Sequence, residues 1–153
     1  MPVSVIPTGF TSVTPYLICR HATEALSFYQ QAFGAEETMR LAAPDGSIGH
    51  AEMRIGTAML MLADESPDMG FVGPESLGGT SVSLMIYVPD ADTVFERAIA
   101  AGALVLRPVT DQFYGDRTGT LQDPFGHWWT IATHLEDLSA EEVARRFEKL
   151  SAG

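Results

Sequence analysis

The chain contains two copies of one pattern, and this internal repeat constrains its fold more than any other feature. Residues 14–64 and residues 83–133 each predict a strand, a helix that ends at glycine, and three further strands. Matching positions keep a near-constant separation, as Leu26 and Phe95 illustrate. A repeat of this length is one supersecondary unit used twice, and neither copy can bury its apolar face alone. The copies are therefore expected to pair and to enclose a ligand-binding cleft.

Composition narrows the class of protein. The 153 residues are 46% hydrophobic, which is enough for one compact domain with a sizeable core. No apolar run approaches the length of about 18 residues that spans a membrane, and no signal peptide is recognisable, so a cytoplasmic location is expected. The one cysteine, Cys19, cannot form an internal disulfide. A net charge of −11 disfavours nucleic acid and anionic membranes as partners.

Shifts in composition predict the domain organisation. A central domain is built from the two repeats, and Pro/Gly-rich segments flank and connect them. Connections as long as the central one are usually lids, binding loops or linkers. The expected parts are an arm over 1–12, one domain over 13–135 with repeats 13–64 and 80–135 joined by a linker over 65–79, and a helical tail over 136–153.

Capping residues predict the helices. The first helix is expected over 22–33, where apolar residues recur at helical spacing and a glycine follows. The second is expected over 91–101, behind Asp90 as its N-cap. The tail helix begins with a capping box formed by Ser139 and Glu142.

Strand alternation predicts which side chains face the cleft. In residues 82–88 an aliphatic set alternates with Ser83, Met85 and Tyr87. The aliphatic set should pack against helices and the mixed set should face the cleft. The repeat extends this assignment to further positions: Thr14, Tyr16, Ile18, Met59, Met61, Trp128, Thr130 and Ala132. The expected fold class is α+β, with helices on one side of a concave mixed sheet.

Several segments resemble a known family. They are YLICRHATEALSFYQQAFGAEE, DGSIGHAEMRIG and DQFYGDRTGTLQDPFGHWWTIATH. Together they resemble the glyoxalase/bleomycin-resistance/extradiol-dioxygenase group, the vicinal oxygen chelate superfamily, and within it the PhnB-like branch. The resemblance implies paired βαβββ modules, a homodimer, and small-molecule binding in the concave cavity; both exchange and no exchange of modules between the two chains are compatible with it. Functions in this group range from isomerases and dioxygenases to drug-sequestering proteins, so the fold does not fix the reaction.

The resemblance also locates the metal ligands of the family. Metal-dependent members take a His or Glu from positions that correspond here to Thr14, Met61, Ser83 and Thr130. Hydroxyls and one thioether are poor ligands for Zn, Ni or Fe. We therefore expect no metal at the usual place and no cofactor. This departure disfavours lactoylglutathione lyase and extradiol dioxygenase activities.

One strand carries the candidate catalytic residues. His50, Glu52 and Arg54 alternate with apolar residues, so they face the cleft or solvent. A cleft-facing His beside a carboxylate is a candidate general base. The alternative is a solvated edge strand with cross-strand ion pairs. A relocated metal site formed by His50, Glu52 and His134 is a further alternative.

The second repeat supplies most of the candidate ligand-binding residues. Arg117 is a candidate clamp for a carboxylate or phosphate, or else it pairs with Asp116. Trp128 is a candidate stacking partner for a planar ligand, or else it fills the cavity. His127, in the DPFGH turn, is expected to satisfy local backbone groups. The ligand-binding set comprises Tyr16, Met61, Ser83, Tyr87, Tyr114, Arg117, Trp128 and Thr130.

Three functions remain open on this evidence. The first is binding of a small, partly apolar organic molecule in a cleft without the family metal ligands. The second is a lyase or isomerase, metal-independent or with a relocated metal, that uses His50 and Glu52. The third is an interaction domain whose own side chains fill its cleft. The sequence favours binding, because the residues that make relatives catalytic are missing.

Overall fold

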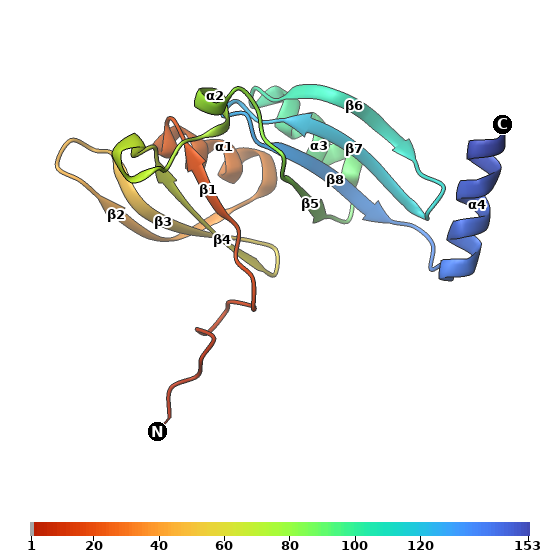
Figure 1. Cartoon of the computed structure of the whole chain (residues 1–153), viewed down its shortest axis with the longest axis horizontal. Helices are drawn as coiled ribbons and strands as arrows, with labels where there is room; N and C mark the ends of the chain where they lie inside the picture. Colours follow the sequence, from red (N-terminus) through yellow and green to blue (C-terminus); the bar gives the residue numbers. More distant parts are fainter. Residues whose placement is uncertain (1) are drawn as a thin grey trace. The chain divides into compact units, whose positions relative to one another are not determined.

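The computed structural model describes residues 2–153 and divides them into two compact units. The first unit runs to Ser81 and also includes Pro124–His127, and the second comprises Val82–Asp123 and Trp128–Gly153. Figure 1 traces the first unit from red to green and the second mainly from green to blue. Over residues 2–153, no helix is both long and apolar enough to cross a membrane.

The first unit is a four-stranded sheet with one long helix. The strand order is β1-β4-β3-β2, with β1 parallel to β4 and the other pairs antiparallel (Figure 1). Within the arm expected over 1–12, residues 2–12 form neither helix nor strand, and Met1 lies outside the described residues. The elements are β1 (Tyr16–Cys19), α1 (Ala22–Phe33), β2 (Glu36–Ala42), β3 (Ile48–Ile55) and β4 (Ala58–Asp64).

Helix α1 covers one face of this sheet. Its bounds match the prediction, and it ends where Gly34 adopts a left-handed conformation with φ of 69°. Its buried side chains face those of β1, β3 and β4, so the core of the first unit lies between helix and sheet. The buried residues of these strands include Leu17, Cys19, Ala51, Met53, Ile55, Leu60 and Leu62.

The connection after β4 is held down by polar contacts. It contains the short helices η1 (Pro67–Met69) and α2 (Pro74–Leu77). The Glu65 carboxylate accepts hydrogen bonds from the Gly73 N–H at 2.9 Å and from the Ser76 hydroxyl at 2.6 Å. These bonds lower the pKa of Glu65. The connection predicted as a lid, binding loop or linker is therefore an ordered segment of the first unit.

The second unit repeats this topology. Its strand order is β5-β8-β7-β6, with β5 parallel to β8 and the other pairs antiparallel. The βαβββ order predicted from the repeat is thus confirmed in both units. The elements are β5 (Ser83–Tyr87), α3 (Ala91–Ala100), β6 (Leu104–Asp111), β7 (Asp116–Gln122), β8 (Trp128–His134) and α4 (Ala140–Ala152).

Helix α3 packs closely on β7. A Cβ atom added to Gly119 would lie 2.8 Å from the Phe95 ring and 2.7 Å from Val109, so this strand position must lack a side chain. Trp129 is fully buried in the same unit, and its indole N–H donates to the Asp123 carboxylate at 2.8 Å. The helix-packed face of the second sheet therefore has its own close-packed core.

Equivalent positions of the repeat secure the start of each long helix. An Asp64 oxygen accepts from the N–H of Ala22 at 2.8 Å, and its other oxygen accepts from Ile48 at 2.6 Å. In the second unit the Thr133 hydroxyl accepts from the N–H of Ala91 at 2.8 Å. Asp64 is the last residue of β4 and Thr133 is the next-to-last residue of β8, while Ala22 and Ala91 each begin a helix. Both bonds satisfy a helix N–H that has no partner within the helix.

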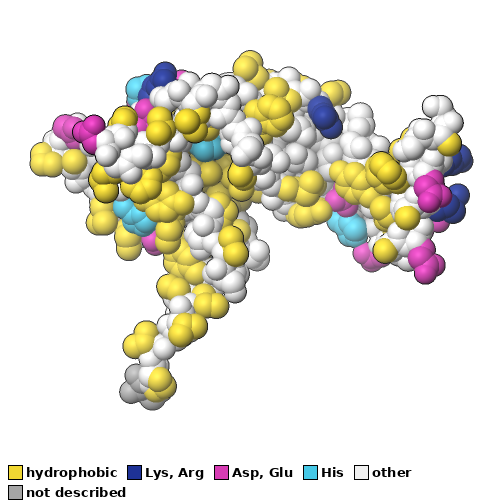
Figure 2. Space-filling model, in the orientation of Figure 1, with side chains coloured by type: hydrophobic (Ala, Val, Ile, Leu, Met, Phe, Trp, Pro, Cys, Tyr) yellow, Lys and Arg dark blue, Asp and Glu magenta, His cyan; other side chains and the backbone are white. Residues whose placement is uncertain are grey.

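The C-terminal helix α4 begins as the capping box predicts. The Ser139 hydroxyl accepts from the Glu142 N–H at 3.1 Å. Phe147 contacts the Phe113 ring with centroids 5.8 Å apart, and Arg146 donates to the Phe113 carbonyl at 3.1 Å. Figure 2 shows hydrophobic, basic and acidic side chains together along this helix.

Candidate functional site

Three polar side chains form a hydrogen-bonded chain on the face of the first sheet that α1 leaves uncovered, here called the open face. The Tyr16 hydroxyl lies 2.8 Å from His50 Nδ1, and His50 Nε2 lies 2.9 Å from a Glu52 carboxylate oxygen. The side chains of His50 and Glu52 are only 23% and 15% exposed. Because β4 lies between β1 and β3, these residues meet across three strands, with Met61 between Tyr16 and Glu52.

The chemistry of these groups fixes the direction of the hydrogen bonds. A carboxylate only accepts, so His50 Nε2 carries the proton in the bond to Glu52. Burial, followed by the negative charge of Glu52, raises the pKa of Tyr16. A protonated Tyr16 hydroxyl can donate to Nδ1, so both ring nitrogens of His50 are engaged in this chain of hydrogen bonds. Tyr16 is more exposed than His50, so Tyr16 is the member of these three hydrogen-bonded side chains that a ligand can reach.

A hollow of about 300 Å³ adjoins this hydrogen-bonded chain in the first unit. Tyr16 and Ile18 line it from β1, and Ala63 lines it from the end of β4. Met69 and Phe71 of the connection close another side, and both expose much of their apolar surface. We call it the first hollow. Its volume is at the lower end of the range of about 300–1,000 Å³ for small-molecule sites.

The open face of the second sheet carries a different polar chain. The Tyr87 hydroxyl donates to Asp116 at 2.8 Å, and the other Asp116 oxygen lies 2.7 Å from His134 Nδ1. His134 Nε2 lies 2.7 Å from Asp137. The bonds to Asp116 and then to Asp137 raise the pKa of His134, and the bond to Asp116 raises that of Tyr87. Asp116 is 4% exposed, so its partners satisfy a buried charge.

A second hollow, of about 310 Å³, lies on the open face of the second sheet. Two predicted ligand-binding residues, Tyr114 and Thr130, line it together with Met85. Arg107 also lines it, and sequence reasoning did not select this residue. No sequence signal marks Arg107, because only the strand register of β6 places it opposite Thr120.

The remaining predicted ligand-binding residues occupy varied environments. Ser83 and Trp128 are exposed, and the Trp128 indole N–H donates to Gln122 at 3.1 Å. Arg117 binds Asp92 at 2.7 Å and Asp111 at 2.9 Å, not Asp116. These two carboxylates raise the pKa of Arg117 further above its usual range. Neither hollow includes Arg117 among its lining residues.

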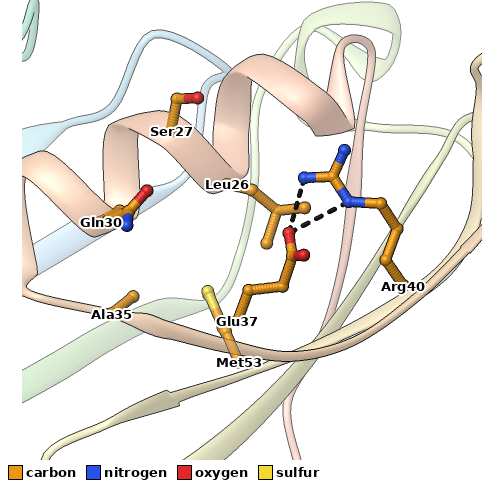
Figure 3. A pocket seen from close by; sticks show the side chains of 7 residues that line it. All are labelled: Leu26, Ser27, Gln30, Ala35, Glu37, Arg40 and Met53. Carbon is orange, nitrogen blue, oxygen red and sulfur yellow. Dashed lines mark hydrogen bonds and ion pairs between the residues drawn. The ribbon is translucent and has the colours of Figure 1, made fainter.

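A third hollow lies between α1 and the first sheet, but it is too small for an organic ligand. Figure 3 shows Leu26 and Met53 beside an ion pair between Glu37 and Arg40, whose atoms are 2.6 Å apart. Its volume is about 40 Å³, which has room for water only.

Metal-ligating side chains do not gather at any point of the part of the chain that the structure describes. No group of three or more His, Cys, Asp and Glu residues there has an arrangement that would hold a metal ion. The positions that correspond to the family ligands carry hydroxyl and thioether groups: Thr14, Met61, Ser83 and Thr130. Such a donor set does not fit the transition metals that the resemblance implies.

Comparisons with known proteins place the chain in a family. The sequence model of the Glyoxalase/Bleomycin resistance protein/Dioxygenase superfamily matches residues 10–131. The uncharacterised protein Mb0911c of Mycobacterium bovis is 38% identical over 146 residues, which are 94% of this chain and 93% of that protein. Protein PA1353 from Pseudomonas aeruginosa superimposes with a TM-score of 0.68 at 26% identity, covering 82% of this chain and 99% of that one.

A PhnB protein is also among the structural neighbours. The protein from Bacillus cereus has a TM-score of 0.64 at 22% identity, and the match covers 80% of this chain and 99% of that chain. At this identity the likeness speaks for the fold alone. The family model covers most of the chain and agrees with the motifs from which the resemblance was predicted. The chain therefore belongs to the glyoxalase/bleomycin resistance protein/dioxygenase superfamily.

Proposed function

We propose that this protein binds a small, partly apolar organic molecule on the open face of its sheets, at a site without the family metal ligands. The first hollow carries the proposal. Ile18, Met69 and Phe71 form apolar walls of this hollow. A ligand that places its hydrocarbon part against them removes apolar surface from water, which favours binding. The Tyr16 hydroxyl at its edge supplies one oriented polar group. Asp64, Glu65 and Ser66 also line the hollow, so its walls are mixed polar and apolar, which suits a partly apolar molecule.

A neutral aromatic alcohol, 2-naphthol, is a suitable probe for this site. We expect Phe71→Ala to weaken its affinity by roughly 1–2 kcal/mol, about 5- to 30-fold, because the mutation removes an apolar wall. The matched control is Leu77→Ala, which removes an exposed apolar side chain from the same connection but does not line the hollow. Calorimetric titration of the three proteins measures the effect. Equal affinities, or no binding by the unmodified protein, would contradict the proposal.

A second candidate function is a lyase or isomerase that uses the Tyr16–His50–Glu52 chain as a proton relay. The hydrogen bonds of 2.8 and 2.9 Å favour it, since proton transfer requires such contacts. The relay requires that Glu52 act on Tyr16 through His50. We therefore expect Glu52→Gln to lower the pKa of Tyr16 toward its usual value of 10.0, because it removes a negative charge.

Ultraviolet difference titration of the phenol, with Tyr16→Phe as the blank for the other tyrosines, measures this shift. An unchanged pKa would exclude the coupling and with it the relay. A relocated metal is tested separately by metal content per chain after incubation with Ni, Zn, Fe and Mn. Stoichiometric binding that His50→Gln abolishes would favour the relocated-metal enzyme over passive binding.

We also propose that two copies associate, as the family resemblance implies. The exposed apolar side chains Met39 and Leu41 on the first sheet and Phe147 and Leu150 on α4 support this proposal. Burial of such side chains between copies would stabilise a dimer. Light scattering coupled to size exclusion measures the mass, and a monomer at micromolar concentration would contradict it.

A further inference from the structure

One arginine in the second unit stands apart from the others in its electrostatic surroundings. Six of the eight arginines among the described residues have a carboxylate partner within 4.0 Å, and Arg97 and Arg107 have none. Arg97 lies in the last turn of α3, where a positive charge favours the helix dipole. Arg107 has no such role in a helix. It lines the second hollow instead.

The strand register places a row of hydroxyl groups beside Arg107. Arg107 lies opposite Thr120, Thr120 lies opposite Thr130, and Met85 follows on β5. The hydroxyls of Thr120 and Thr130 are 2.9 Å apart. Paired residues of neighbouring strands point to the same face of a sheet. The row therefore places Arg107 beside Thr120, with Thr130 one strand further on, and all three line the second hollow on the open face.

The lining of the second hollow lacks negative charge. It holds Gln112, Tyr114 and Thr118 in addition to the row, and no Asp or Glu among the described residues. This is unusual in a chain with a net charge of −11. The buried Asp116 lies nearby on β7 but is bonded to Tyr87 and His134. Arg107 thus retains an uncompensated positive charge beside polar hydrogen-bonding groups.

We propose that the second hollow binds the oxyanion of a small organic acid, with Arg107 as its charged anchor. The guanidinium presents donors in a planar fork that matches a carboxylate or a phosphate. Because the Thr120 and Thr130 hydroxyls bond to each other, one of their two protons stays available to donate to the same oxygens. Met85, Phe113 and Tyr114 contact the organic part. The site is distinct in its residues from the first hollow.

The same row explains why this position suits an anion rather than a metal ion. Thr130 is one of the positions where the family resemblance implies a metal ligand. In this chain a hydroxyl replaces that ligand, and a guanidinium shares its row. A fixed positive charge repels a metal cation and attracts an oxyanion. Recognition of a negative group by Arg107 takes the place of a metal in this arrangement.

Three ligands with one ring system test the inference: 2-naphthoate, 2-naphthyl phosphate and neutral 2-naphthol. We expect Arg107→Gln to weaken binding of the anions by about 10- to 100-fold, the effect of a lost charge-assisted hydrogen bond. Binding of 2-naphthol should be unchanged. Arg107→Lys should restore part of the affinity, since it keeps the charge but not the planar fork. The anion with the larger loss identifies carboxylate or phosphate as the preferred group.

The control is Arg97→Gln, which makes the same change of charge in the same unit away from the hollow. An equal loss in both variants would mean a general electrostatic effect and overturn the inference. Binding of 2-naphthoate and 2-naphthyl phosphate that Arg107→Gln leaves unchanged would also overturn it. Because Phe71→Ala tests the first hollow and Arg107→Gln the second, either proposal can fail alone. Circular dichroism of each variant checks that it is folded.

Discussion

Replacing Trp129 with alanine is expected to destabilise the second unit by about 3–5 kcal/mol. Trp129 is fully buried, and the β8 register places it between Leu84 on β5 and Leu121 on β7. Truncation leaves a large cavity in a close-packed core and removes the 2.8 Å hydrogen bond to Asp123. The free energy of unfolding in urea, followed by circular dichroism, measures the loss.

The adjacent tryptophan is the natural control. Trp128 is 42% exposed, and its hydrogen bond to Gln122 lies at the surface. Trp128→Ala should change the free energy of unfolding by no more than about 1 kcal/mol, as surface substitutions do. Similar losses for the two variants would mean that the assignment of the two indoles to opposite faces is wrong.

The fold was predictable because its signals are local and occur twice. Alternation of apolar and polar residues placed Ala51, Met53 and Ile55 in the core and left His50 and Glu52 on the other face, as the structure has them. Helix ends were predictable for the same reason, since a cap involves neighbours in the chain. The same pattern of apolar residues and caps occurs in both repeats, so it predicted the order of strand, helix and three strands in each unit.

The partners of the site residues were not predictable, because they depend on which strands adjoin. Tyr16 joins His50 only because β4 places β1 within reach of β3. Arg117 was expected to clamp a ligand or pair with Asp116, but α3 and β6 supply its two carboxylates. His127 was expected to bond local backbone, and its Nε2 lies 3.0 Å from the carbonyl of Ile18 on β1.

Arg107 shows why sequence reasoning missed part of the candidate site. It is followed by Pro108 in an irregular stretch of β6, where the register shifts on both sides. Simple alternation cannot assign a face across such shifts. Only the observed pairing with Thr120 places Arg107 on the open face. Proline lacks a backbone N–H, and the edge strand β6 tolerates Pro108 because a backbone position on the outer side of an edge strand has no strand to bond to.

Asp64→Ala is expected to destabilise the first unit by about 2–4 kcal/mol, because it removes two charge-assisted hydrogen bonds from backbone N–H groups. One carboxylate oxygen binds the N–H of Ala22 at the start of α1, and the other binds Ile48 at the start of β3. Alanine leaves both N–H groups without this acceptor and removes a negative charge from a helix N-terminus. Urea unfolding measures the loss.

Graded variants separate the two bonds. Asp64→Asn keeps one acceptor oxygen and should lose about half as much free energy of unfolding as Asp64→Ala. At the equivalent position of the second unit, Thr133→Val removes a neutral hydroxyl and should cost about 1 kcal/mol, whereas Thr133→Ser should be nearly neutral. If Asp64→Asn were as damaging as Asp64→Ala, the oxygen that asparagine retains would contribute nothing.

The combination of Asp64→Ala with Thr133→Val tests how independently the repeats are stabilised. The two side chains share no partner, and each secures the helix of its own unit. Their costs should therefore add within about 0.5 kcal/mol. A larger deviation would mean that the two helix tethers are energetically coupled. Additive costs would show that each unit secures its own helix with a side chain on its last strand, independently of the other unit.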